Sequence, residues 1–159
     1  MAELDGRVVL VVGASGGLGS RLVAELAAAG ATVLSASRSS SASFDLRDPQ
    51  SIRDCVGALT ALDGVIVAAG VVAFGPAEQV SDTVLAELFE TNALGPITLI
   101  RELTPLLAES AAAGRTPFIV TLSGIVAESP TAGLAAYSAS KSALAAFVSA
   151  ASRELRRTG

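Results

Sequence analysis

The stretch RVVLVVGASGGLG, residues 7–19, decides the fold. Residues 7–12 are a β-branched apolar run without polar alternation, which is typical of a strand buried on both faces of a parallel sheet. Glycines follow directly, and residues 18–29 then have the spacing of an amphipathic helix. A strand, a glycine-rich turn and a helix in this order predict a unit whose backbone amides and helix N-terminus can hold a pyrophosphate.

Each glycine of this turn has a distinct predicted role. Gly13 permits the tight turn off the strand, Gly17 lets the backbone approach phosphates, and Gly19 allows the helix to pack closely on the sheet. The alternative is an ordinary flexible turn, because a glycine motif alone is a weak signal. The flanking strand and helix favour nucleotide binding, and the predicted contacts are Gly13, Ser15, Gly16, Gly17, Leu18 and Gly19.

The remaining elements predict one α/β domain over residues 1–159. Further strands are expected at residues 31–36, around residues 44–45, and at residues 65–69 and 118–122. Further helices are expected at residues 49–59, 82–107 and 137–157. Gly95 and Pro96 should kink the second of these helices near Asn92. The right-handed crossover rule then gives a doubly wound parallel sheet, a Rossmann fold, of strand order 3-2-1-4-5.

Composition argues against several other classes of protein. The 159 residues are 51% hydrophobic, but the apolar residues come in short bursts and not in a membrane-length run. With one cysteine and no histidine, a transition-metal site has almost no ligands, so no metal is expected. A net charge of −4 without basic blocks argues against a nucleic-acid partner. No signal peptide is evident, and a cytoplasmic location is expected.

The end of the second strand distinguishes the two nicotinamide dinucleotides. An acid there would bind the adenosine ribose, whereas a base would pair with a 2′-phosphate. Ser37 and Arg38 occupy this position, and Arg38 can offer a charge-assisted fork to a phosphate. The alternative is a solvated surface arginine. The sequence therefore favours NADP(H) over NAD(H).

The only tyrosine and the only lysine lie four residues apart in YSASK, residues 137–141. Side chains at i and i+4 share a helix face, so the Lys141 ammonium can approach the Tyr137 phenol and stabilise its anion. A phenol ordinarily has a pKa of about 10, and a close cation lowers it toward the working range. The pair is predicted to transfer a proton; the alternative is an exposed helical pair of no significance.

In the order of these motifs, the chain resembles the short-chain dehydrogenase/reductase family over nearly its whole length. The Gly-x-x-x-Gly-x-Gly turn, the Asn92-Ala93-Leu94-Gly95 segment and the Tyr-x-x-x-Lys motif carry the resemblance. It implies hydride transfer between the nicotinamide and a carbonyl or alcohol carbon, with Tyr137 passing the proton. Lys141 would bind the nicotinamide ribose and stabilise the phenolate, and a carbonyl freed at the Asn92 kink would hold a relay water.

The resemblance implies further contacts. Asp45 matches the acid that reaches the adenine ring, although it could simply cap a turn. Ala69 and Gly70 match the segment where the cofactor approaches the backbone. The helices starting near Ser81 and Tyr137 would form a homo-oligomer interface, as they do in the family.

Three departures from the family stand out. The substrate-orienting serine should lie thirteen residues before Tyr137, where this chain has Gly124, with Ser123 one residue earlier. Ser123 is the candidate replacement, although strand alternation would aim it at the other face. The Asn-Asn-Ala-Gly that follows the fourth strand in the family is reduced to an alanine pair before Gly70, which removes hydrogen-bonding side chains. The family also continues through two further strands and a substrate loop.

Three functions therefore stay open. The leading one is an NADP(H)-dependent oxidoreductase that acts on a small carbonyl or alcohol. The second is a dinucleotide-binding module or fragment with little catalysis, and the third is a structural interaction domain. Residues 118–122 would be an exposed apolar edge strand, so a partner chain or further strands of a longer protein should cover it.

Overall fold

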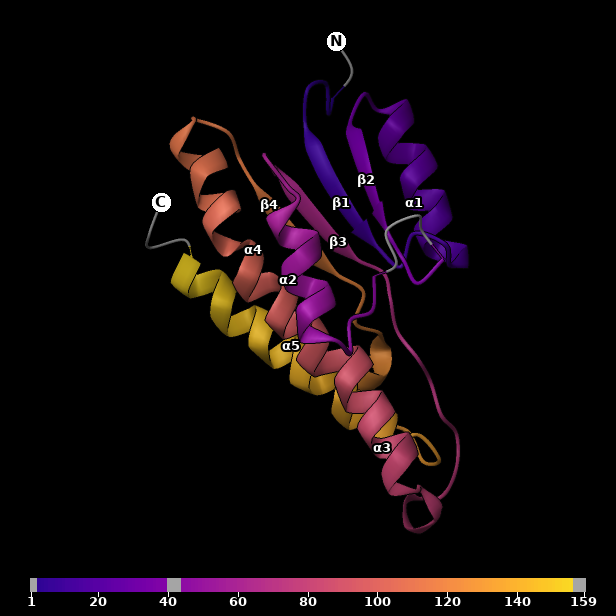
Figure 1. Cartoon of the computed structure of the whole chain (residues 1–159). Helices are drawn as coiled ribbons and strands as arrows, with labels where there is room; N and C mark the ends of the chain where they lie inside the picture. The colour runs from indigo at the N-terminus through magenta and orange to yellow at the C-terminus, as the bar shows by residue number, and fades with distance from the viewer. Residues whose placement is uncertain (1–2, 40–43, 156–159) are drawn as a thin grey trace.

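The computed structural model describes residues 3–39 and 44–155, and Figure 1 shows a twisted sheet with helices on both of its faces. Its strands are β1 (Val8–Val12), β2 (Thr32–Ala36), β3 (Gly64–Val67) and β4 (Phe118–Thr121). They pair in parallel in the order β2-β1-β3-β4. The predicted doubly wound Rossmann-type sheet is confirmed.

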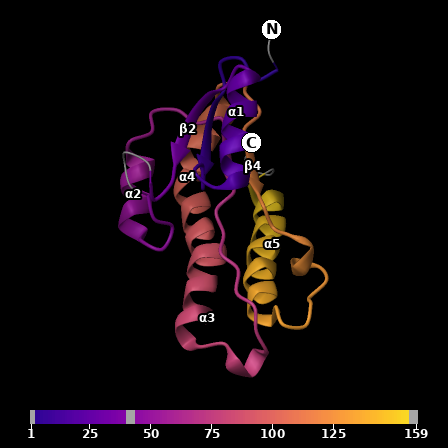
Figure 2. The same cartoon turned by 90° about the vertical axis from the view of Figure 1, so that its right-hand side faces the viewer.

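The helices are α1 (Gly17–Ala28), α2 (Pro49–Gly57), α3 (Asp82–Phe89), α4 (Gly95–Ala112) and α5 (Ala135–Leu155). Short helical segments are η1 (Ala77–Gln79), the π-helix η2 (Glu90–Leu94) and η3 (Ile125–Ala127). Helix α1 covers one face of the sheet, whereas α2 and α4 pack together on the other. Figure 2 shows α3 and the first turns of α5 projecting beyond the carboxyl ends of the strands. None of the described helices is long and apolar enough to cross a bilayer.

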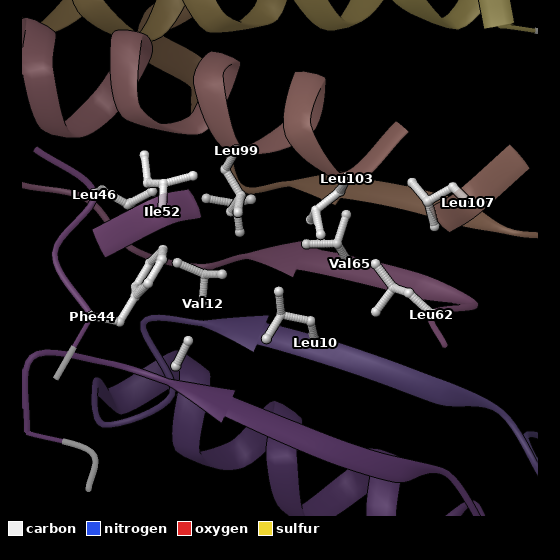
Figure 3. Packing of buried hydrophobic residues seen from close by; sticks show 12 residues of the cluster. Leu10, Val12, Phe44, Leu46, Ile52, Leu62, Val65, Leu99, Leu103 and Leu107 are labelled. Carbon is white, nitrogen blue, oxygen red and sulfur yellow. The ribbon is translucent and has the colours of Figure 1, made fainter. Parts of the chain in front are cut away.

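The core lies between the sheet and the α2–α4 layer (Figure 3). Leu10 and Val12 of β1 point into it, where they meet Ile52 of α2 and Leu99 and Leu103 of α4. The alternate β1 side chains are also buried, on the α1 side. A strand buried on both faces explains why residues 7–12 carry no polar alternation.

The predicted strand around Phe44 and Asp45 is not formed. The Phe44 N–H donates to the Ser37 carbonyl (3.1 Å), but the Asp45 N–H donates to the Ser51 hydroxyl (3.0 Å) and not to β2. A side chain of α2 thus replaces the ladder partner, and Phe44 is buried in the core without strand pairing. The observed sheet is the predicted order without its outermost strand. Residues 40–43 of the serine-rich connection, and residues 156–157 of the last predicted helix, lie outside the described residues.

Asp63 ties together the amino ends of the strands. It lies directly before β3 and is 3% exposed. Its carboxylate accepts hydrogen bonds from the Val8 N–H (2.9 Å), the Ser110 hydroxyl (2.6 Å) and the Arg115 guanidinium (2.7 Å). Arg115 also donates to the Gly6 carbonyl (2.9 Å). Burial alone would raise the pKa of Asp63, but these hydrogen bonds and the Arg115 charge together hold it below its ordinary value.

Strand β4 forms one edge of the sheet, as the sequence predicts. Among the described residues it pairs only with β3. Its Val120 side chain is 40% exposed on the face away from the core. What covers this edge stays a prediction.

Candidate functional site

The turn between β1 and α1 brings the chain close to the segment that follows β3. Gly13 has a φ of +85°, in the left-handed region that favours glycine, and a Cβ there would lie 2.6 Å from the Ala69 nitrogen. Gly19 packs beneath this turn, because a Cβ at Gly19 would collide with the Gly13 carbonyl. Both glycines are required by close backbone approach, which agrees with the roles predicted for them.

This turn opens into a pocket at the carboxyl ends of the strands, where ligands of open α/β sheets bind. The sequence-predicted residues that line it are Gly13, Ser15, Gly16, Arg38, Asp45, Ala69 and Gly70. Gly17, Leu18 and Gly19 do not line it, because α1 begins at Gly17 and the Leu18 side chain points into solvent.

The pocket also contains residues that sequence reasoning missed. Arg47, Glu87 and Thr91 are the polar ones, and they come from the loop before α2, from α3 and from the π-helix. Thr91 is the neighbour of Asn92, and Glu87 lies four residues before Thr91. This i,i+4 spacing could have indicated that both side chains share one helix face. Arg47 follows Asp45 by two residues, which is the spacing of an Asx turn.

Asp45 and Arg47 form an ion pair at the rim of the pocket. The guanidinium Nε and Nη2 donate to the two carboxylate oxygens of Asp45 at 3.2 and 2.9 Å. The side-chain hydrogen bond from Arg47 is the main reason that the pKa of Asp45 is lowered, against the opposing effect of burial. Its backbone hydrogen bond and the charges of Arg47 and Arg38 lower this pKa further. Asp45 is therefore an ionised carboxylate that already has a cationic partner.

The long helix is interrupted at Asn92, as predicted. Residues Glu90–Leu94 form a π-helix in which the Gly95 N–H reaches back to the Glu90 carbonyl. Pro96 has no N–H, so the Asn92 carbonyl lacks the i+4 donor that an α-helix would supply. The sequence signal, a glycine and a proline in the middle of an apolar periodicity, was therefore sufficient to place the kink.

The Asn92 side chain joins three elements. Its Oδ1 accepts from the Val71 N–H (2.9 Å), and its Nδ2 donates to the Val71 carbonyl (2.8 Å) and to the Ser140 hydroxyl (3.0 Å). Ser140 in turn donates to the Tyr137 carbonyl (2.8 Å). Asn92 is 1% exposed, so this network fixes the start of α5 relative to the end of β3.

Tyr137 and Lys141 lie one turn apart on α5, and Tyr137 is half-buried. Lys141 is 5% exposed, its Nζ donates to the Leu122 carbonyl (2.8 Å), and burial lowers the pKa of its ammonium. A Cβ on Gly70 would lie 3.3 Å from this Nζ and 3.2 Å from Asn92 Oδ1. The ammonium therefore lies beside the glycine that lines the pocket.

The position of the expected serine has an unusual backbone. Gly124 has φ +125° and ψ 152°, a conformation that is open almost only to glycine. The Ser123 hydroxyl is buried and has no hydrogen-bond partner among the described residues, and the same holds for Ser138 next to Tyr137. Two unpaired hydroxyls therefore lie on the residues next to Gly124 and Tyr137.

A larger hollow of about 650 Å³ lies between β2 and α2. It shares only Asp45 with the pocket described above and does not include the glycine turn. The predicted site residues Asn92, Ser123, Tyr137 and Lys141 line neither of the two pockets. Its size does not make it the candidate site, because the glycine turn and Gly70, which lies beside the Lys141 ammonium, line the smaller pocket.

The sequence and the structure both match known proteins. The family model described as short chain dehydrogenase matches residues 7–159. No curated protein matches the sequence.

Among solved structures, a short-chain dehydrogenase from Streptomyces avermitilis has 28% identity and a TM-score of 0.87, over 96% of this chain and 62% of that one. Two others show likeness of fold. Aldohexose dehydrogenase from Thermoplasma acidophilum has 21% identity and a TM-score of 0.87, over 96% of this chain and 63% of that one. The 3-ketoacyl-(acyl-carrier-protein) reductase from Brucella melitensis, complexed with NADH, has 23% identity and a TM-score of 0.91, over 98% and 73%. The chain thus spans under two thirds of two of these proteins.

Proposed function

We propose that this chain, which belongs to the short-chain dehydrogenase/reductase family, is an NADP(H)-dependent oxidoreductase acting on a carbonyl or alcohol carbon. The observation that carries the proposal is that Lys141 and Asn92 lie beside Gly70, a glycine that lines the pocket, with Tyr137 on the same helix as Lys141. Short motifs match by chance, but a buried ammonium beside a pocket glycine is a specific arrangement.

The described residues fit a dinucleotide. The turn from Gly13 to Gly16 presents backbone at the N-terminus of α1, where N–H groups and the helix dipole favour a pyrophosphate. Gly70 leaves open a space beside Lys141 that a side chain would fill. Lys141 has three donor positions, of which one is used by the Leu122 carbonyl, so the ammonium retains donors for ribose hydroxyls.

When bound, the nicotinamide would supply or accept the hydride. Tyr137 would give its phenolic proton to a carbonyl oxygen during reduction, or take the proton of a hydroxyl during oxidation. The Lys141 ammonium would stabilise the phenolate from the same helix face. Ser123, if its hydroxyl reaches the substrate oxygen, would add one donor to the site.

The preference for NADP(H) rests on Arg38, which lines the pocket at the end of β2. No acid occupies this position, so the residue that a 2′-phosphate would meet at the end of β2 is a guanidinium. We expect Arg38→Gln to weaken NADPH binding about 10-fold while NADH binding stays within about twofold, since a charge-assisted hydrogen bond is worth about 1.5–3 kcal/mol. An equal loss of affinity for NADPH and NADH, measured by fluorescence titration, would show that Arg38 does not bind the 2′-phosphate.

Turnover is tested by NADPH oxidation against a panel of ketones and aldehydes. Tyr137→Phe should abolish turnover and leave the NADPH dissociation constant nearly unchanged, because it removes only the phenolic hydroxyl that transfers the proton. The second candidate function, a dinucleotide-binding module, is favoured by Gly124 in place of the expected serine. NADPH binding without turnover on any carbonyl would support that second function.

We also propose that the chain forms a homo-oligomer through the helices that start near Ser81 and Tyr137. Leu85 of α3 and Leu94 of the π-helix are exposed apolar side chains, which supports a contact there. Analytical ultracentrifugation should show a dimer or tetramer, and Leu94→Glu should shift it toward monomer. A wild-type chain that is monomeric at all concentrations would exclude this interface.

A further inference from the structure

Strand β2 forms the edge of the sheet opposite β4, and this edge is open (Figure 1). Among the described residues, β2 pairs only with β1. The Thr32 N–H donates to the Arg7 carbonyl (2.8 Å), so Thr32 turns its main-chain groups toward β1. Successive residues of a strand present these groups to opposite sides, so Val33 and Ser35 turn theirs away from β1. Their N–H and C=O groups are therefore available to another strand.

The segment that follows β2 approaches this edge at one end. The Phe44 N–H donates to the Ser37 carbonyl (3.1 Å), just beyond the strand. The chain then leaves the edge, because the Asp45 N–H donates to the Ser51 hydroxyl (3.0 Å). Of the described residues between β2 and α2, none therefore continues a strand along the rest of the edge.

The hollow between β2 and α2 lies along this open edge. Val33 and Ser35 line it, together with the half-buried Leu34, Cys55 and Leu59. These three apolar side chains also pack against the buried core. The volume of about 650 Å³ is within the range of about 300–1,000 Å³ that is usual for ligand pockets. A residue of an added strand opposite Leu34 would point to the same face, so an apolar side chain there would extend the core into the hollow.

The carboxylates around the hollow indicate the charge of a partner. Asp48 and Asp54 line the hollow and are exposed, and no described arginine or lysine lines it. Asp45 also lines it, but Arg47 donates to both of its carboxylate oxygens. Within the described residues, neither Asp48 nor Asp54 forms an ion pair. Two copies of the chain joined at this edge would bring like charges together, so the charge favours a cationic partner over a second copy.

We propose that the open edge of β2 binds an extended segment of another protein as an added strand. One large apolar side chain of that segment would fill the hollow. An arginine or lysine two residues away on each side would share its face and lie toward Asp48 and Asp54, which are about 9 Å apart along the helix axis. The main-chain groups of Val33 and Ser35 would supply affinity, and the hollow and the carboxylates would supply specificity. This inference goes beyond the proposed function, because it requires no dinucleotide.

The probe is a fluorescein-labelled peptide, Thr-Arg-Thr-Leu-Thr-Arg-Thr, in which leucine and both arginines share one face of a strand. We expect wild type to bind it, as measured by fluorescence anisotropy. The same peptide with glutamate in place of arginine should bind at least about 10-fold more weakly, because like charges would then meet at α2.

N-methylated peptides test the main-chain pairing. One peptide carries a methyl group on the leucine amide, and the other carries methyl groups on the two flanking threonine amides. Only one of these two sets of amides can face β2 in an added strand. One methylated peptide should therefore keep its affinity, and the other should bind about 10-fold more weakly.

Two variants test the protein side. Ser35→Pro removes an N–H that faces the open edge, where a strand tolerates proline, and should weaken peptide binding about 10-fold. Asp54→Asn keeps an oxygen for the Gln50 side-chain amide but loses the charge, so binding should weaken about threefold. Glu25→Gln is the matched control, because Glu25 is an exposed carboxylate on α1 that lines neither pocket. It should leave the affinity unchanged.

Three results would overturn the proposal. The first is no binding of the basic peptide to wild type at about 1 mM, the limit of weak association. The second is equal affinity of the two methylated peptides, which need only wild type and so keep the test valid if Ser35→Pro does not fold. The third is a wild-type oligomer that Ser35→Pro converts to monomer in analytical ultracentrifugation, because a second copy would then occupy the edge. None of these measurements contains a dinucleotide, so their failure is distinct from failure of the proposed function.

Discussion

The two ends of the sheet use polar groups in opposite ways. At the amino ends of the strands, Asp63 is almost fully buried and all of its hydrogen-bonding partners belong to the chain. At the carboxyl ends, the hydroxyls of Ser123 and Ser138 have no partner among the described residues, and the buried Lys141 ammonium donates to the Leu122 carbonyl. The amino ends thus stabilise the fold, and the unpaired hydroxyls at the carboxyl ends support our proposal that a ligand binds there.

The largest expected effect tests the carboxyl end. Lys141→Met should lower kcat/KM by about 10³-fold, because it removes the cation that stabilises the phenolate and holds ribose hydroxyls. It should not lower the melting temperature, because a buried ammonium costs desolvation that a thioether does not. A melting temperature several degrees lower, measured by differential scanning fluorimetry, would show that Lys141 stabilises the fold. The two ends of the sheet would then not differ in the way described.

The amino end should behave in the reverse manner. Asp63→Ala leaves the Val8 N–H, the Ser110 hydroxyl and the Arg115 guanidinium without their acceptor, and we expect a loss of about 2–3 kcal/mol in the free energy of unfolding. The expected loss in unfolding free energy is smaller than for a fully buried ion pair, because the Arg115 side chain is 46% exposed and solvent screens its charge. Urea denaturation measures the loss. The NADPH dissociation constant should stay within about twofold of wild type, and a larger change would mean that the two ends are coupled.

A smaller effect concerns pH. The pKa of Asp63 in the folded chain is held below its ordinary value of 3.8, so its contribution to stability is fully present above that value. The contribution is lost as the pH falls through the lower folded pKa. Stability against urea should therefore fall as the pH drops below 3.8, and Asp63→Asn should make this fall at acid pH less steep. An unchanged slope in the variant would show that other carboxylates cause it.

The smallest effect separates the two unpaired hydroxyls. Ser123→Ala and Ser138→Ala each remove a buried hydroxyl without a hydrogen-bond partner, so each should stabilise the fold by about 0.5–1 kcal/mol. Only Ser123→Ala should also lower kcat, if its hydroxyl serves the substrate oxygen. Equal kcat in both variants and in wild type would show that Ser123 has no role in catalysis.

The sequence was sufficient for the features that depend on local spacing. The buried strand β1, the glycine turn, the kink at Asn92 and the Tyr137–Lys141 pair are all readable from residues within a few positions of one another. The strand expected at Phe44 and Asp45 was wrong because a distant hydroxyl, that of Ser51, takes the N–H that would have paired with β2.

Arg47 and Glu87 were missed for a related reason. Neither belongs to a motif, and they meet only because the Leu46 carbonyl packs against Gly95 and brings the loop before α2 to the kinked helix. The local spacings could have drawn attention to each residue, but the contact that brings both to one pocket has no periodicity along the chain.

The Asn92 amide also extends the hydrogen bonding of the sheet. A carboxamide is chemically a peptide unit, and here it offers one acceptor and one donor to the two main-chain groups of Val71, as a residue of a neighbouring strand would. A helix side chain thus acts as one extra rung of the sheet beyond Val67, in a chain that has alanines at positions 68 and 69. Insertion of a single residue between Ser81 and Asn92 would turn this amide away from Val71, so the length of α3 is set by the sheet as much as by the helix itself.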